Sequence, residues 1–156
     1  MAQNKNNEAT LRRMARIAEI IKDQELLHKI GLQFAQHVRI RTQKGIDVKG
    51  HSFRPYSDRY AKKRSKAGQP THPVNLTMDH KTGMLSKIDH FVFKDLSGLQ
   101  AYISDPEKAQ IGRYHHIEGA GKSRVIRQFW GLTDKQIELI RNEIKKDLDE
   151  LFKENL

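Results

Sequence analysis

A dense group of cationic side chains, in the thirteen residues from Arg54 to Lys66, carries the clearest chemistry in this sequence. The segment holds six Lys and Arg residues and one carboxylate, Asp58. Clustered cations attract polyanions or acidic protein surfaces, so this composition predicts a binding segment rather than a catalytic one. The candidate protein-contact or DNA-contact residues are Arg54, Arg59, Lys62, Lys63, Arg64 and Lys66.

The distribution of charge supports a binding role but leaves the partner open. Residues 1–66 hold 16 Lys and Arg against 6 Asp and Glu, whereas residues 67–156 hold 13 of each, so the net charge of +10 lies in the first part. Tyr56 and Tyr60 lie among the cations, and such interleaving suits stacking on nucleic-acid bases. The same rings could instead pack the loop against the domain. The sequence alone does not choose between nucleic acid, an acidic protein and a solvated loop.

The histidines do not have the spacing of a metal site. His115 and His116 are adjacent, so on a helix they point to different faces, and no HExxH or His-carboxylate spacing accompanies them. The sequence has no cysteine, which excludes thiol nucleophiles, disulfides and cysteine-based zinc sites. We therefore expect no metal ion, and we expect one packed and one exposed histidine at this pair.

The sequence also lacks a complete catalytic motif. Gly119–Ser123 ends in Gly-Lys-Ser as a phosphate-binding loop does, but the first glycine of that motif would fall at His116, so a flexible turn is the better interpretation. No nucleophile elbow or kinase signature is present. Asp47, Asp58 and Asp79 are scattered through the basic region, which leaves a nuclease open by spacing alone. We predict that the protein is not an enzyme and binds no cofactor.

The length of 156 residues is typical of one domain, which would bury roughly 70% of its unfolded surface. The polar start of the chain lacks the apolar core of a secretory signal, and no run approaches the roughly 20 apolar residues that span a bilayer. We expect a soluble protein without a membrane partner. We also expect a flexible N-terminus over residues 1–9 and a single domain over residues 10–156.

Apolar residues recur at helical spacing near both ends of the chain, which predicts amphipathic helices there. One helix is expected over residues 11–21, and a second, capped by Asp23, runs to about Thr42. Ser104–Glu107 has the features of a third helix start, and that helix should stop at Gly119. The C-terminal helix follows a capping box at Thr133–Gln136 and presents one apolar face. That face consists of Ile137, Ile140, Ile144, Leu148 and Leu151.

Alternating apolar residues predict a small antiparallel sheet. Phe91 and Phe93 alternate as one strand, Asp95–Gly98 supplies a turn, and Leu99–Ile103 alternates as the partner strand. Ile46–Val48 is long enough only for an edge strand.

A long loop separates the second helix from the hairpin. Gly and Pro occur so often between about residues 49 and 75 that only a short helix around Ser57–Lys66 fits there. A further short helix is expected after the loop, at Met84–Ile88. Loops of this length are usually functional or disordered. The sequence therefore predicts an α+β fold, in which a small antiparallel sheet packs with N-terminal and C-terminal amphipathic helices and carries a long basic loop.

The order of several short segments resembles the phage virion morphogenesis proteins, which are the tail-completion proteins of Mu-like and P2-like tailed phages. The resemblance covers about residues 25–150 and departs from the family pattern at two places. Met78–Lys81 separates two elements that the family joins more tightly, and Gln128 and Trp130 replace residues of an Arg-Pro-Phe-Leu-Gly segment. The segments that carry the resemblance are Gly45–Gly50, Phe53–Ser57, Leu76–Thr77, Thr82–Leu85, Tyr114–Gly119 and Arg127–Thr133.

The resemblance implies a structural protein of the virion neck that is made in the host cytoplasm. It implies a small α+β subunit in a homo-oligomeric ring, hexameric in the family, that joins the tail to the head connector. Its partners would be the tail tube or tail terminator and the connector, with nonspecific DNA contact in the channel as a further expectation. Phe129 and Trp130 are expected in the core or in a subunit contact. The competing hypothesis is a nonspecific nucleic-acid-binding protein that acts through the basic loop.

Overall fold

The computed structural model describes residues 24–74, 76 and 83–155, and it has the predicted α+β fold. The helix expected over 11–21, the cap at Asp23 and the flexible segment 1–9 lie outside the described residues. In chain order the elements are α2 (Gln24–Gln43), α3 (Asp58–Lys66), the 3₁₀ helix η1 (Met84–Lys87), β1 (Ile88–Val92), β2 (Leu99–Ile103), α4 (Pro106–Arg113), the π-helical turn η2 (Tyr114–Glu118) and α5 (Asp134–Asn155).

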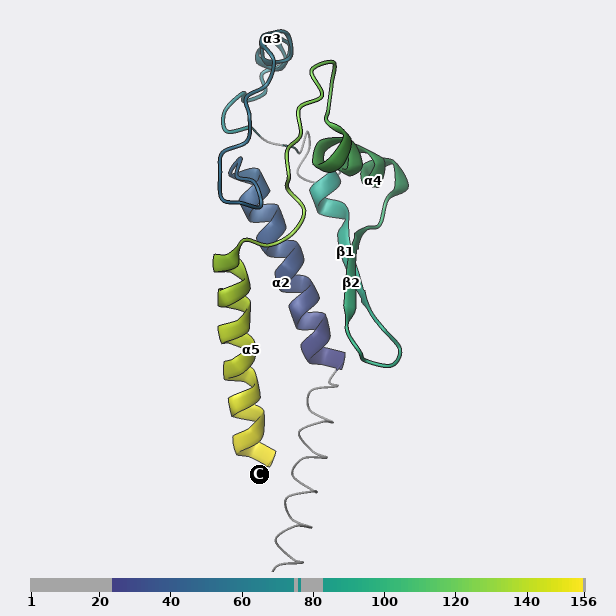
Figure 1. The fold of residues 1–156 in the computed structure, drawn as a ribbon, viewed down its shortest axis with the longest axis vertical. Helices are drawn as coiled ribbons and strands as arrows, with labels where there is room; N and C mark the ends of the chain where they lie inside the picture. Colours follow the sequence, from purple (N-terminus) through teal and green to yellow (C-terminus); the bar gives the residue numbers. More distant parts are fainter. Residues whose placement is uncertain (1–23, 75, 77–82, 156) are drawn as a thin grey trace, which may run out of the picture.

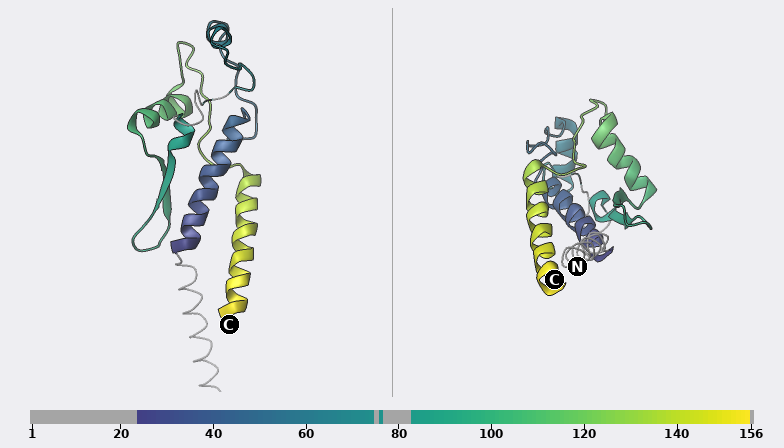
Figure 2. Two further views of the ribbon diagram at one scale, coloured as in Figure 1. Left: turned by 180° about the vertical axis from the view of Figure 1, so that it is seen from behind. Right: turned by 60° about the horizontal axis from the view of Figure 1, so that its bottom comes forward.

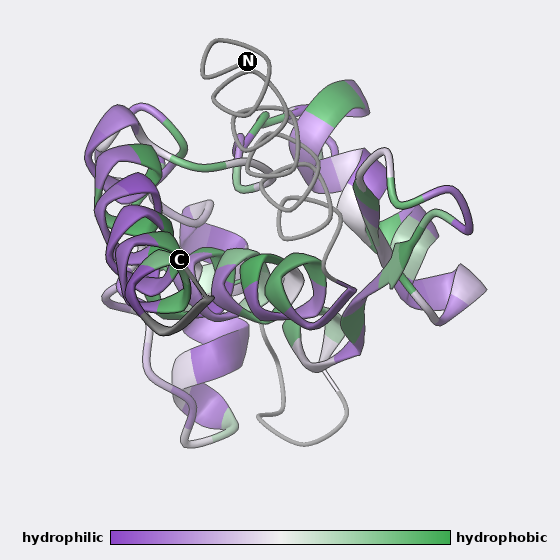
Figure 3. Ribbon diagram, turned by 90° about the horizontal axis from the view of Figure 1, so that it is seen from below, coloured by the Kyte–Doolittle hydropathy of each residue, from purple (hydrophilic) through white to green (hydrophobic). Residues whose placement is uncertain are grey.

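Helix α2 is the centre of the fold, with the hairpin on one side and α5 on the other (Figures 1 and 2). Residues of both kinds, hydrophobic and hydrophilic, alternate along α2 and α5, as Figure 3 shows. The C-terminal helix packs against α2, and α2 lies between it and the sheet. Two ion pairs join the two helices, from Lys29 Nζ of α2 to Asp147 Oδ2 at 2.6 Å and to Glu143 Oε1 at 3.6 Å, both on α5.

Helix α2 approaches the hairpin closely because it carries a glycine at the crossing point. The His90 ring of β1 lies where the Cβ of any other residue at position 31 would have to stand, so Gly31 leaves room for that ring. His90 Nε2 also lies 3.0 Å from His28 Nδ1, one turn earlier on α2. Arg39 adds a second connection, since its guanidinium donates to the carbonyls of Leu85 and Ile88, at 2.7 Å each.

The predicted hairpin is confirmed, but its aromatic residues face outward. Strands β1 and β2 pair antiparallel, with Ile88 opposite Ile103 and Phe91 opposite Gln100. Phe91 and Phe93 are both exposed, and the Phe91 ring lies 5.9 Å from that of Tyr102. The inward residues of β1 are those of the other parity, beginning with the buried Ile88.

The predicted helix boundaries agree well with the structure. Asp105 caps α4 by accepting from Lys108 N, and the helical run continues through η2 to Gly119, whose φ of +85° favours glycine. Thr133 and Gln136 form the expected capping box at α5. The short helix expected at Met84–Ile88 ends one residue earlier, since Ile88 begins β1. Ile46–Val48, expected to form an edge strand at most, forms an isolated bridge from Ile46 to Ser52 and no strand.

The core forms where the segment after residue 127 crosses the end of α2. Phe129 is 1% exposed and lies among buried residues from α2, η1 and the long loop, including Val38, Leu85 and Phe53. Arg41 of α2 secures this segment through its guanidinium. It donates to the carbonyl of Phe129, to that of Gly131 at 2.8 Å and to Gln136 Oε1 at 2.7 Å.

Candidate binding cleft

A cleft of about 770 Å³ lies between α3, the helical run from α4 into η2, and the turn at 120–125. Besides two buried arginines in its wall, four cationic side chains from three separate elements line it: Arg59 and Lys63 from α3, Lys108 from α4 and Lys122 from the turn. None of the described residues along its walls is an Asp or Glu. The walls therefore carry positive charge only, within the part of the chain that the structure describes.

Arg64 is part of the wall of the cleft and differs from the other cations of its helix. It is 4% exposed, and its Nε donates to the Pro70 carbonyl at 3.0 Å. Its guanidinium carbon lies 5.1 Å from the centre of the Tyr56 ring and 6.0 Å from that of Tyr60. Arg64, a candidate contact residue by sequence, is buried in this fold, where its guanidinium packs against the rings of Tyr56 and Tyr60.

Arg127 is the second buried guanidinium in the wall, and it ties the loop to the segment that leads into the core. Its Nε and Nη2 donate to the Arg54 carbonyl at 3.2 and 3.0 Å, and Nη2 also donates to the Pro55 carbonyl at 3.1 Å. Its own backbone N–H donates to the His115 carbonyl at 2.7 Å. Burial lowers the pKa of Arg127 from its usual value, although a guanidinium stays charged at neutral pH.

His115 adds a half-buried imidazole to the same wall. Burial and the nearby charge of Arg127 lower the pKa of His115 to about 4, so its ring is neutral at pH 7. The neighbouring His116 turns toward the core, where its Nδ1 accepts from the backbone N–H of Trp130 at 3.3 Å. Both histidines are half-buried, so the expected pair of one packed and one exposed histidine is wrong.

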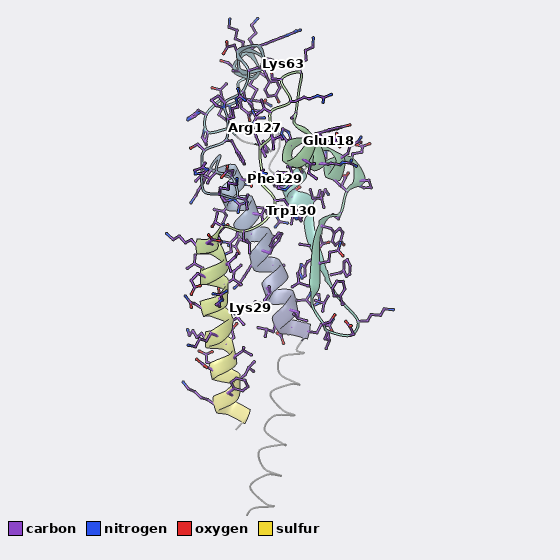
Figure 4. All side chains as sticks on the ribbon, in the orientation of Figure 1. Lys29, Lys63, Glu118, Arg127, Phe129 and Trp130 are labelled. Carbon is purple, nitrogen blue, oxygen red and sulfur yellow. The ribbon has the colours of Figure 1, made fainter. Side chains whose placement is uncertain are left out.

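The structure separates the sequence-predicted cations into three groups. Arg59 and Lys63 face the cleft, Arg64 lies in its wall, and the remaining three are exposed outside it. These three are Arg54, Lys62 and Lys66. Figure 4 shows Lys63 and Arg127 at the same end of the molecule, with Phe129 and Trp130 nearer its centre.

Sequence reasoning missed Lys108 and Lys122, which complete the cleft. Lys122 lies in the Gly-Lys-Ser segment, whose turn closes with a bridge between Ala120 and Val125. Lys108 stands in the first turn of α4, where a lone lysine gives no signal. Nothing in the local sequence relates either residue to α3, because the cleft forms only when these segments pack together.

The two aromatic residues expected in the core or in a contact have different surroundings. Phe129 is fully buried, with its ring 5.7 Å from that of His116. Trp130 is half-buried and packs against the core, with its ring 5.4 Å from that of Phe34 on α2. Phe129 is thus a core residue of the single chain.

The side chains around the cleft are suited to electrostatic attraction. Among the described residues, no group of three or more His, Asp or Glu side chains is arranged to hold a metal ion. The described helices also include none that is long and apolar enough to cross a membrane. Four cations around a partly apolar opening are suited to a negatively charged partner.

Comparison of the chain with protein-family models, with curated proteins and with solved structures finds no significant match.

Proposed function

We propose that this protein is a structural virion protein of a tailed phage or prophage, a tail-completion or neck subunit whose ring joins the tail to the head connector. The observation that supports the proposal is that the segments that resemble the tail-completion proteins contact one another in the fold. Segments up to 80 residues apart in the sequence, as Val48 and Gln128 are, contact one another around Arg127 and Phe129.

The contacts between these segments are specific. Arg127 donates to carbonyls of the Phe53–Ser57 segment and to the carbonyl of His115. Phe129 shares the core with Phe53, Met84 and Leu85, which belong to two other resembling segments. Gln128 accepts from the N–H of Val48, in the Gly45–Gly50 segment, at 2.8 Å. Residues that touch in this way must be compatible with one another, which gives the order of the motifs a physical basis.

The cleft supports a joining role over a catalytic one. A subunit that joins two assemblies needs a surface with strong electrostatic preference, and the cleft has four cations with no described carboxylate along its walls. It does not need a nucleophile or a general base. The imidazole in the wall, that of His115, is a weak base, since burial and the charge of Arg127 lower its pKa to about 4.

Deletion of the gene from the phage or prophage that carries it tests the proposal. Lysates should then contain DNA-filled heads and complete tails that are not joined, and expression of the wild-type chain from a plasmid should restore whole particles. Antibody-gold labelling of whole particles should mark the neck. Normal particles in the deletion strain would contradict the proposal.

A second candidate is a nonspecific nucleic-acid-binding protein. The observation in its favour is that Arg54, Lys62 and Lys66 are exposed outside the cleft, where they are accessible to a phosphate backbone. Sizing with light scattering separates the two candidates. A ring that forms without DNA supports the neck subunit, whereas a monomer that changes size only with DNA, and less so as salt rises, supports the second candidate.

A further inference from the structure

We propose that the cleft binds an acidic segment of a partner protein that inserts an apolar side chain between the cations. This inference deepens the proposed function by naming the chemistry of the partner, and it rests on that function only for the identity of the partner. The binding itself can be measured on the isolated protein. It can therefore fail or succeed independently of particle assembly.

The first argument is that the cations around the cleft lack acidic partners in the described part of the chain. The ion pairs found there do not include these cations, and Glu118, on the adjoining turn η2, is paired with Arg113 at 2.6 Å. Arg64 and Arg127 are neutralised by no described carboxylate either, since their hydrogen bonds go to backbone carbonyls. A negatively charged ligand would supply the missing countercharge.

The second argument is that the cleft also has apolar walls. Met84 and Leu76 are buried at its base, and Val125 lines the turn side. Ile111 of α4 is 40% exposed and faces the same space. Apolar surface among cations is suited to a peptide with a Leu or Phe between carboxylates. Burial of that side chain would add to the attraction between the charges.

The third argument is that the tyrosines are poorly placed to bind nucleic acid, because bases stack only on ring faces that are free. Two guanidinium groups lie over the Tyr56 ring, that of Arg64 at 5.1 Å and that of Arg127 at 5.6 Å. The Tyr60 ring packs edge-on against Tyr56 and also lies near Arg64. Bases that would stack on these rings must compete with the internal cations, whereas a carboxylate needs no ring face.

The binding experiment uses a fluorescein-labelled synthetic peptide in which Glu and Asp residues flank one Leu and one Phe. Binding to the full-length protein is followed by fluorescence anisotropy. Unlabelled competitors are a peptide of the same charge with Gly in place of Leu and Phe, and a single-stranded oligonucleotide of equal charge. The unlabelled Leu-Phe peptide should compete most strongly, and the affinities of the Gly peptide and the oligonucleotide should be at least about tenfold weaker.

Helix α3 offers two double charge reversals, one at cations that line the cleft and one at neighbouring cations that do not. Arg59→Glu with Lys63→Glu changes two exposed cations that line the cleft, and should weaken peptide binding about tenfold or more. Lys62→Glu with Lys66→Glu makes the same change of charge at the same spacing outside the cleft, and should weaken it less than about twofold. Lys122→Glu, on the opposite wall, repeats the test if the α3 variant does not fold.

The apolar part of the inference has its own pair of variants. Ile111→Gln should reduce affinity for the Leu-Phe peptide and leave the Gly peptide unchanged, whereas Ile126→Gln, at an exposed isoleucine outside the cleft, should affect neither. Equal losses for the two charge-reversal pairs would overturn the proposal, since attraction would then be general to the helix. Equal or stronger competition by the oligonucleotide would also overturn it and favour nucleic acid as the ligand.

Discussion

Replacement of Arg127 by lysine tests whether the buried guanidinium supports the cleft by its shape or only by its charge. Arg127 is 6% exposed and reaches two carbonyls, those of Arg54 and Pro55, with Nε and Nη2 sharing the first oxygen. A lysine ammonium keeps the charge but reaches only one of these oxygens. One hydrogen bond to a charged donor, about 1.5–2 kcal/mol, is then lost. The contact with Tyr56, about 0.5–1 kcal/mol, is lost as well.

The sum predicts that Arg127→Lys lowers the free energy of unfolding by about 2–3 kcal/mol. Urea unfolding followed by the fluorescence of Trp130, the single tryptophan, measures this change through the midpoint and slope. Arg124→Lys is the matched control, because Arg124 is exposed in the same turn and should change stability by less than about 0.5 kcal/mol. A loss below about 1 kcal/mol for Arg127→Lys, or an equal loss in the control, would refute the reasoning.

Three further predictions concern the scaffold around the cleft. Phe129→Ala should lower the free energy of unfolding by about 3–5 kcal/mol in the same urea assay, since its side chain is fully buried. A change near zero would contradict the place of Phe129 in the core. Gly31→Ala should destabilise the fold by about 1–3 kcal/mol despite the better helix propensity of alanine, because the new methyl group meets the His90 ring. In a His90→Ala background that cost should vanish, and strictly additive losses would rule out the clash. The folded pKa of His115, about 4, lies below its ordinary value of 6.5, so its contribution to stability is complete above pH 6.5 and is lost as pH falls toward 4. His115→Gln should flatten the pH dependence in that window, and identical profiles for variant and wild type would contradict a buried neutral ring.

Local rules in the sequence were enough to predict most of the secondary structure. The capping box at Thr133 and Gln136 and the Asp105-Pro106 helix start depend on hydrogen bonds within one turn, so neighbouring residues determine them. The turn between β1 and β2 is likewise local, and the α+β class follows from these elements. Periodicity could not say which parity of β1 would be covered. The helix α2 covers the face of Ile88 and leaves Phe91 exposed.

The cleft depended on contacts that no local pattern contains. No local pattern distinguishes Arg59, Lys63 and Arg64, because all three are cations on one short helix. Their environments differ because Arg64 reaches Pro70 and the tyrosine rings, while the other two face a space that Lys108 and Lys122 also line, 45 to 63 positions further along the chain. Lys108 and Lys122 join them only through the packing of α4 and the following turn. The sequence by itself determined that this protein concentrates positive charge in its first part, and the tertiary structure decided which of those charges meet around one opening, because burial depends on neighbours that are distant in the chain.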